Sequence, residues 1–399
     1  MASHGIRDRV AIIGMGCTPF REHWDRSLDD LLIEAHGLAL ASAGMTKDDI
    51  DAYWYGTSQS SASGISLATP LRLDNRPVTR VENYCATGSE RRCARPATRW
   101  PPGPTTWRWP SVPRRSRTAA TRASTPSRSP PTGPTARSPR RPCSASPLPA
   151  YAERYGIDED DLRHVVARIA EKNHYNGARN ELAQFRQETS AEVICDMAAV
   201  AGRLSVFDCA GVADGAAAAI VVSAEQAADL CDDPLYVKAL SLVAGNGSGL
   251  VDPSFDFTTL PECAASAADA YAQAGITDPR AELAMAEVHD CFTPTELVLM
   301  EDLGFCDRGT AWREVLDGTF ALDGDLPVNP DGGLKSFGHP VGASGLRMHY
   351  EAWLQLRGRA PEERRIGTLA DRSRALVHNL GGYPGEMVSF VGIVGTEKD

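Results

Sequence analysis

The chain has 399 residues, of which 42% are hydrophobic, and a formal net charge of −11. This length exceeds one small core, so we expect two domains or a fused repeat. The acidic balance argues against nucleic-acid binding. No apolar run approaches the ~20 residues of a membrane helix. The ten cysteines form no CxxC pairs, so they predict neither a disulfide framework nor a metal site. The N-terminus lacks a secretory pattern, so we expect a cytoplasmic protein.

The first predicted elements alternate between strand and helix. Residues 9–20 predict a buried strand that leaves through a glycine turn, and the apolar spacing after Ser27 predicts an amphipathic helix. Residues 50–57 and 78–84 predict two further strands. This alternation is typical of an α/β architecture.

Residues 91–150 depart from the rest of the chain. They contain 13 Arg, no Lys, Asp or Glu, and 14 of the 27 prolines, and without them 28 basic residues face 52 acidic ones. Prolines at this density exclude helices and interior strands. Three explanations remain open: a disordered basic linker, a nucleic-acid arm, or a stretch at about 91–148 that is translated in the wrong frame.

The genetic code offers a test of the shifted frame. If each true codon combines the last base of one printed codon with the first two bases of the next, residues 98–121 can read YAVASGAYDVALAVGAEKVKDSGY, and 132–145 can read DGTNRTLTAPAMFS. The first string is a helix end, a glycine turn and an apolar strand, which continues the surrounding pattern. We therefore favour the shifted frame; a single uninterrupted frame across 91–150 in the gene would contradict it.

Strands and helices alternate again after this segment. Asp158 begins a predicted amphipathic helix, residues 173–187 are polar and predict a loop, and residues 216–222 predict a buried strand. A second series starts at 236–246. The similar alternation in 1–235 and 236–399 suggests a duplicated α/β unit.

Cys85 lies in ENYCATGSE, between a predicted strand and a predicted helix start. Helix N-termini and nearby cations lower the pKa of a cysteine from its usual ~8.5, so this position favours a thiolate nucleophile. On this motif alone, a buried structural cysteine is the alternative.

Two further motifs carry candidate proton-transfer groups. His339 lies in SFGHPVG, where a glycine- and proline-rich loop could hold its imidazole as a base for a thiol. His289 and Cys291 lie in EVHDCF at a predicted strand end, and alternation along a strand places them on one face.

A fourth motif, HNLGGYPG, begins at His378. It predicts a strand that ends in a glycine turn at Gly381 and Gly382, whose N–H groups could stabilise an oxyanion. For His378 itself, a packing role and a direct role are both open.

The four motifs are CAT (85–87), HDCF (289–292), GHP (338–340) and HNLG (378–381), and in this order they resemble the thiolase superfamily. The chain is similar in particular to the branch of acetyl-CoA acetyltransferases related to the thiolase domain of sterol carrier protein, over residues 9–90 and 151–397. The resemblance implies an α/β thiolase fold: two homologous βαβαβαββ halves in a layered αβαβα arrangement, with a loop domain inserted within about 120–200.

The resemblance also implies ping-pong acyl transfer between acyl-CoA or 3-ketoacyl-CoA and CoA, with no further cofactor. His339 would activate Cys85, and Cys291 would handle the proton on the α-carbon. His289 would assist one oxyanion hole, and the N–H groups of Cys85 and of the Gly381–Gly382 turn would form another. A homodimer and an OB-fold, zinc-ribbon partner protein are further implications.

Two other functions remain open. The first is retro-aldol cleavage of a steroid side-chain CoA ester, which some relatives perform; Cys85 and His339 argue against it because aldol cleavage needs no acyl-enzyme. The second is an inactive CoA- or lipid-binding homologue. If residues 91–150 are native as printed, an interior strand is lost at a cost beyond the ~5–15 kcal/mol stability of a domain, and we expect poor folding or no activity.

Overall fold

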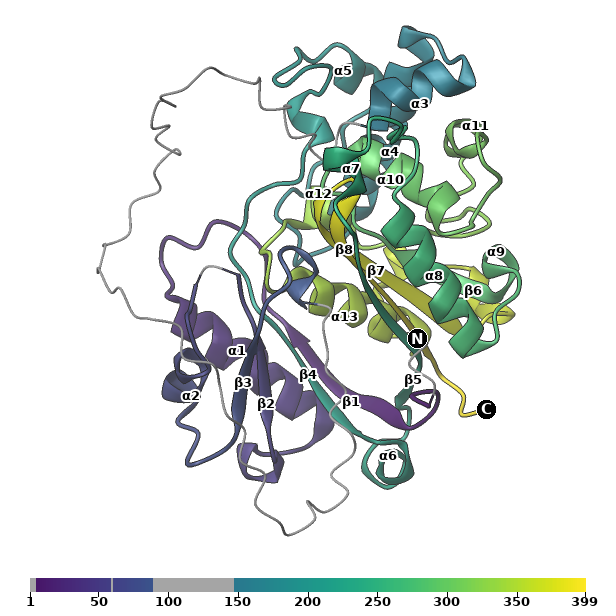
Figure 1. Ribbon diagram of the computed structural model, residues 1–399. Helices are drawn as coiled ribbons and strands as arrows, with labels where there is room; N and C mark the ends of the chain where they lie inside the picture. Colours follow the sequence, from purple (N-terminus) through teal and green to yellow (C-terminus); the bar gives the residue numbers. More distant parts are fainter. Residues whose placement is uncertain (1–4, 59, 89–146) are drawn as a thin grey trace.

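The computed structural model describes residues 5–58, 60–88 and 147–399 (Figure 1). The strands are β1 (Val10–Cys17), β2 (Tyr53–Gly56), β3 (Val78–Val81), β4 (Ala217–Ser223), β5 (Leu235–Ala244), β6 (Leu283–Glu287), β7 (Arg374–Tyr383) and β8 (Glu386–Gly395). The α-helices are α1 (Leu28–Ala43), α2 (Ile65–Leu71), α3 (Pro147–Tyr155), α4 (Glu159–Ala178), α5 (Ala191–Cys195), α6 (Ala224–Leu230), α7 (Ser248–Val251), α8 (Pro261–Ala274), α9 (Pro279–Glu282), α10 (Thr293–Asp302), α11 (Ala311–Leu316), α12 (Gly333–Phe337) and α13 (Ser344–Leu356).

Two sheets are present in the described part of the chain. One has six strands in the order β4-β1-β5-β8-β7-β6, and the other consists of β2 and β3 paired in parallel. Within the larger sheet, β6 and β7 are parallel, and the pairs β7–β8, β5–β8, β1–β5 and β1–β4 are antiparallel. The fold is therefore of the α/β class that the alternation of elements predicts.

Helices cover the strands in layers. Helix α1 packs on β1 and β4, α8 packs on β5 and β8, and α13 contacts strands of both halves, namely β1, β4, β6 and β7. Figure 1 shows α13 between the purple and teal strands β1 and β4 and the yellow strands β7 and β8. No helix in the described ranges is long and apolar enough to cross a membrane.

The local sequence explains the first two elements. All eight residues of β1 are buried, as a run that is apolar on both faces requires. The side chain of Ser27 accepts a hydrogen bond from the Asp30 N–H at 3.2 Å and so caps α1, which ends at Gly44 in the left-handed conformation (φ 65°). The predicted helix after Ser27 is confirmed.

Helix α4 extends to Ala178, into the stretch 173–187 that its polarity predicts to be a loop. That prediction is wrong over its first six residues because the polar side chains are buried in hydrogen bonds. The amide of Asn173 donates to Asp290 Oδ2 at 2.8 Å, and that of Asn176 donates to the Asn329 carbonyl at 2.9 Å. Polarity here marks a buried network rather than a solvated loop.

The arginine- and proline-rich segment falls almost entirely outside the described residues. The linker, nucleic-acid-arm and shifted-frame explanations, and the part of the expected loop domain before 147, all concern residues that the structure does not describe. At its C-terminal edge, however, α3 begins at Pro147, so residues 147–150 are helical, contrary to the exclusion of helices there. Prolines are tolerated in a first helical turn because its N–H groups have no intrahelical acceptor.

The expected boundary between residues 235 and 236 stays a prediction. β5, the first strand of the second series, begins at Leu235. Next to it, the two ends of the chain meet: Arg7 forms an ion pair with Asp399, and the buried Lys238 ammonium of β5 lies 2.7 Å from Asp8 Oδ1 and 3.4 Å from Asp399 Oδ1. The N and C labels lie close together in Figure 1.

Candidate active site

Cys85 lies in a tight turn between β3 and the short 3-10 helix η2 (Ala86–Gly88). Tyr84, directly before it, has a positive φ of 49°, which a bulky residue adopts only when its surroundings hold it. Thr87 supplies that restraint, because its hydroxyl accepts from the Asn83 N–H at 2.8 Å and donates to the Tyr84 carbonyl. The turn presents Cys85 in a fixed direction.

Three of the predicted site residues converge. Cys85 Sγ and one ring nitrogen each of His289 and His339 lie within 4.8 Å of one another. The two imidazoles meet edge to face, with centroids 5.3 Å apart and planes at 86°. The three residues are separated by 50 to 254 positions in the sequence, so the fold alone brings them together.

The hydrogen bonds of His339 determine its tautomer. Ser344 Oγ donates its only proton to the Pro340 carbonyl at 3.0 Å, so at the 2.8 Å contact with His339 Nδ1 the ring nitrogen must be the donor. The other nitrogen, Nε2, is buried with no hydrogen-bond partner among the described residues and carries the lone pair of a neutral imidazole. This nitrogen is suited to accept a proton.

His289 is held in the same tautomer by Asn379. The amide nitrogen of Asn379 donates to the Cys85 carbonyl at 2.9 Å, which directs its Oδ1 toward His289 Nδ1, so Nδ1 donates there. In the part of the chain that the structure describes, His289 Nε2 is buried without a hydrogen-bond partner. Asn379 was not among the predicted site residues, although it lies in the HNLG motif. Neighbouring residues of a strand face opposite sides, so the motif indicated that either His378 or Asn379 faces the site.

Asp290 ties the two histidine loops together. Its carboxylate accepts from the backbone N–H groups of Leu334 at 2.6 Å and Lys335 at 3.1 Å, in the helix α12 that leads to His339. Burial raises the pKa of Asp290 to about 7. The residue after His289 therefore sets the position of the loop that carries His339.

Burial dominates the electrostatics of the site. It raises the pKa of the Cys85 thiol to about 11, lowers that of His289 to about 4, and holds that of His339 well below its usual value. The expectation that Cys85 rests as a thiolate is therefore not met, because desolvation disfavours the charged form. The resting site holds a neutral thiol beside two neutral imidazoles.

The remaining predicted residues occupy different positions. His378 turns to the Ser389 hydroxyl at 3.3 Å, on the other face of β7 from Asn379. Cys291 is half-buried against an apolar cluster and, among the described residues, is not part of the group of atoms within 4.8 Å. Gly381 and Gly382 are strand residues of β7 paired with Val388 and Met387, so the turn predicted there is wrong.

Gly381 nevertheless lies against the nucleophile. A Cβ at this position would lie 2.6 Å from the Cys85 backbone nitrogen, so only glycine permits this approach. The hairpin turn comes later, at Pro384 and Gly385, because the β7–β8 pairing continues to Tyr383. The backbone of β7 thus borders the Cys85 N–H without turning.

Known proteins resemble this chain along its length. Residues 251–392 match the family described as thiolase C-terminal domain-like. The chain is 31% identical to the acetyl-CoA acetyltransferase of Methanothermobacter thermautotrophicus, over 95% of this chain and 98% of that protein. It is 32% identical to sterol carrier protein 2 of Bos taurus, over 58% of this chain and 41% of that protein.

The fold also matches a solved structure, the Ltp2-ChsH2(DUF35) aldolase, with a TM-score of 0.73 and 22% identity over 99% of both chains. At this identity the likeness concerns the fold alone. Its extent covers both halves of the molecule, including the segments that carry all four motifs.

Proposed function

Because the chain belongs to the thiolase superfamily, in its sterol-carrier-protein-type branch, we propose that it is an acyl-CoA C-acyltransferase with Cys85 as its nucleophile. The expected thiolase fold is confirmed with the family. The observation that carries the proposal is the convergence of Cys85 Sγ with His289 and His339 within 4.8 Å.

The first step is proton transfer from the Cys85 thiol to His339 Nε2. The sulfur then attacks the substrate carbonyl, and the resulting oxyanion collapses. With a 3-ketoacyl-CoA the bond between the α-carbon and the keto carbon breaks, the α-carbon takes a proton from Cys291, and acyl-Cys85 remains. CoA thiol then attacks acyl-Cys85, and its proton restores the enzyme. The reverse sequence is condensation.

The N–H of Cys85 and the neighbouring backbone at Gly381 and Gly382 are the proposed donors to the oxyanion on the acyl group. The close approach of Gly381 supports this role. His339 becomes a second donor once it holds the proton of Cys85. His289 can donate only as an imidazolium, because its resting Nε2 is an acceptor, and we assign it to an oxyanion only in that form.

Trapping of the acyl-enzyme tests the proposal. The protein is mixed with acetyl-CoA and digested, and mass spectrometry locates the acetyl group. Cys85 should carry it, Cys85→Ala should abolish it, and Cys291→Ala should keep acylation while losing carbon–carbon bond chemistry. Cys195→Ala is the matched control, because Cys195 also has a histidine neighbour, His164, at 3.8 Å outside the site.

Three outcomes would contradict the proposal. Cleavage of a substrate without any acyl-Cys85 would favour the retro-aldolase alternative, and binding of acyl-CoA without turnover would favour an inactive homologue. Since a thiol and two imidazoles are also zinc ligands, loss of acylation after chelator treatment, restored by Zn²⁺, would indicate a metal site instead.

The remaining expectations extend this proposal. A homodimer and an OB-fold, zinc-ribbon partner would complete the assembly implied by the family, and CoA thioesters would be the only small molecules required. A cytoplasmic location fits CoA as the acyl acceptor. Light scattering of the purified chain, alone and with an OB-fold, zinc-ribbon protein, tests the two assembly states.

A further inference from the structure

The two histidines beside Cys85 each keep one ring nitrogen free. Among the described residues, neither His289 Nε2 nor His339 Nε2 has a hydrogen-bond partner, and both atoms are buried. Each Nδ1 is already engaged, with Asn379 in one case and Ser344 in the other. Each Nε2 therefore has a lone pair available to an ion or a ligand. Buried polar atoms without any partner are rare in proteins and call for such an explanation.

The Cys85 sulfur supplies a third donor atom at the same place. Cys85 Sγ and one nitrogen of each imidazole lie within 4.8 Å of one another. A tetrahedral zinc site with Zn–N distances of ~2.0–2.1 Å and a Zn–S distance of ~2.3 Å has ligand–ligand separations of ~3.3–3.6 Å. A change of at most ~1.5 Å in each separation therefore completes the geometry. Imidazole nitrogen and thiolate sulfur are ligands that suit Zn²⁺.

The groups behind the two histidines match the surroundings of metal-binding imidazoles. A histidine that binds a metal through one nitrogen almost always donates its other N–H to an oxygen, which fixes the ring. His339 Nδ1 donates to Ser344 Oγ at 2.8 Å, and His289 Nδ1 donates to Asn379 Oδ1. Both acceptors are themselves held by backbone carbonyls, at 3.0 and 2.9 Å. The two rings are thus oriented before any metal binds.

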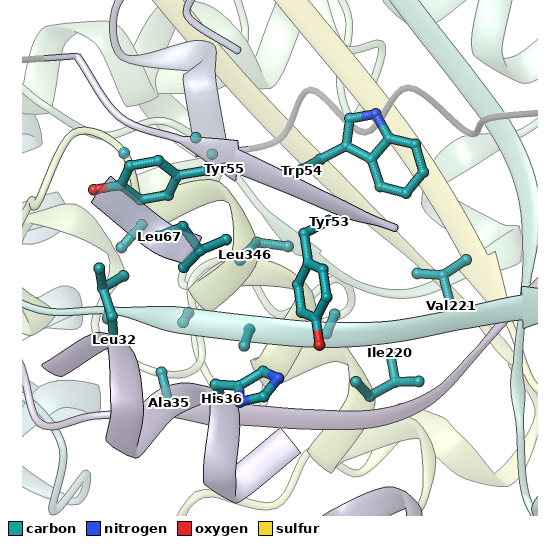
Figure 2. Close-up of a pocket in the computed structure, with 18 of the residues that line it drawn as sticks. Leu32, Ala35, His36, Tyr53, Trp54, Tyr55, Leu67, Ile220, Val221 and Leu346 are labelled. Atoms are coloured by element: carbon teal, nitrogen blue, oxygen red, sulfur yellow. The ribbon is translucent and has the colours of Figure 1, made fainter. Parts of the chain in front are cut away.

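A free imidazole nitrogen alone does not make a metal site. His36 of α1 also has a buried Nε2 that finds no hydrogen-bond partner in the described ranges. Figure 2 shows His36 beside Tyr53 in a cavity of about 1690 Å³ that β2 and β4 line, and the two ring centroids lie 5.7 Å apart. Within residues 5–58, 60–88 and 147–399, three metal-ligating side chains come this close together only at Cys85, His289 and His339.

The three side chains form a site that is closed on one side and open on the other. His289 is fully buried, whereas Cys85 and His339 are half-buried. An ion held by all three would have its fourth tetrahedral position on the accessible side. Three protein ligands with one open position are typical of zinc that exchanges a ligand, and four protein ligands are typical of structural zinc. The arrangement therefore favours a reversible site.

We propose that Cys85, His289 and His339 form a Zn²⁺ site, and that the bound ion holds the protein in a reversible inactive state. Binding forms one Zn–S and two Zn–N bonds, the Cys85 thiol releases its proton to solvent, and a water molecule fills the fourth position. The ion occupies both the sulfur that attacks an acyl-CoA and the Nε2 that accepts its proton. The inhibition rests on the acyltransferase function proposed above, whereas the binding does not.

Zinc binding to the full chain tests the site without any assay of activity. Calorimetric titration should give one Zn²⁺ per chain, and zinc X-ray absorption should show one sulfur at ~2.3 Å and two nitrogens at ~2.0–2.1 Å. His289→Ala should weaken binding by at least about a hundredfold, and Ser344→Ala, which leaves all three ligands in place, by about tenfold. Binding of several ions per chain, or a bound ion without sulfur, would overturn the proposal.

The matched controls are histidines that lack the full ligand set. His36→Ala removes a free Nε2 that lies outside the group of three, and His164→Ala removes an imidazole whose cysteine neighbour, Cys195, is 3.8 Å away. Both variants should bind Zn²⁺ with the affinity of the unaltered chain. Weakening by His164→Ala equal to that by His289→Ala would place the ion elsewhere and overturn the proposal.

Unfolding by urea covers variants that are less stable. The ion joins Cys85 of the first half to two histidines of the second, so Zn²⁺ should raise the urea midpoint of the unaltered chain. The rise should disappear in Cys85→Ser and persist in Cys195→Ser. An equal rise in both variants would show that Zn²⁺ binds without Cys85 and would overturn the proposal.

Acylation by acetyl-CoA separates the zinc site from the acyltransferase proposal. At a Zn²⁺ concentration about tenfold above its Kd, mass action leaves about one chain in ten free, so a chelator should raise the acylation rate by about tenfold. Acylation that Zn²⁺ does not slow, or that a chelator abolishes, would overturn the inactive state. A chain that binds Zn²⁺ through one sulfur and two nitrogens but is never acylated would keep the site and refute the acyltransferase proposal.

Discussion

The two halves of the molecule follow one strand order, but within residues 5–58, 60–88 and 147–399 only the second half has a continuous sheet. In the second half, β5, β8, β7 and β6 are paired edge to edge, and β7 carries Asn379 and Gly381 to the active site. In the first half, β2 and β4 stand apart across a cavity, and Cys85 follows β3 on the detached side. Among the described strands, the two histidines thus lie beside the six-stranded sheet, and Cys85 follows a strand of the separate two-stranded sheet.

The contrast between the halves concerns the contacts that hold Cys85 near the two histidines. The described contacts of Cys85 with the second half, through Asn379 and Gly381, hold the nucleophile near its bases. From its own half, the part of the chain that the structure describes contributes the Tyr84–Thr87 turn.

The largest effect is expected at the base. His339→Ala removes the Nε2 lone pair that accepts the Cys85 proton, and with the thiol pKa at about 11 little thiolate forms without it. The acylation rate at pH 7 should fall by about a thousandfold. Stopped-flow acylation measures this, with His164→Ala as the control outside the site. A loss below tenfold would mean that His289 serves as the base.

A structural prediction of similar size concerns Arg347 in α13. This fully buried guanidinium lies 2.6 Å from Glu287 and also pairs with Asp331, both buried. Arg347→Met leaves two buried carboxylates unpaired and should cost about 3–5 kcal/mol of unfolding free energy. Arg280→Met, whose pairs with Glu314 and Asp325 are partly exposed, should cost less than about 1 kcal/mol in the same urea titration.

Equal costs for the two arginine variants would show that the closed half draws no stability from its buried ion pairs. A raised midpoint in Arg347→Met would show that the apolar replacement packs well enough to offset the unpaired carboxylates.

A pair of truncations compares the halves directly. Leu376→Ala in β7 opens a hole in a closed core and should cost about 2–5 kcal/mol. Ile220→Ala in β4 removes a side chain that already borders the cavity and should cost only about 1 kcal/mol. Urea denaturation gives both values. Similar costs at the two positions would remove the contrast between the halves.

The smallest expected effect is a shift in pH dependence. Asn379→Asp keeps an acceptor for His289 Nδ1 but places a carboxylate there, which favours the imidazolium and raises the His289 pKa from about 4. The acid limb of the acylation profile should move to higher pH, because a protonated His289 turns a positive charge toward His339. Asn246→Asp, at an exposed turn, should leave the profile unchanged.

Some of the residues predicted for the site from the sequence lie there and others do not, and the reasons are physical. Cys85, His289 and His339 were predicted and lie together. His378 and Asn379 are neighbours on one strand, and nothing in the sequence says which face of β7 meets the nucleophile. Gly381 and Gly382 were expected in a turn because glycine pairs signal turns locally, but the pairing with β8 overrides that preference.

The pKa of Cys85 and the burial of a polar stretch could not be predicted from the sequence either. A cysteine before a helix suggests a lowered pKa, yet its value depends on burial and on the charges that the fold brings near. Here desolvation is the cause, and it raises the pKa. Likewise the polar stretch at 173–187 looked solvated because its partners, Asp290 and Asn329, lie more than a hundred residues away.

The ion pairs that join the chain ends have a practical consequence for protein engineering. Arg7, Asp8 and Asp399 meet around the buried Lys238, so a short Gly-Ser linker could fuse the ends without moving a strand. New ends opened within 89–146 would yield a circular permutant that begins with α3 and finishes at Cys85 and η2.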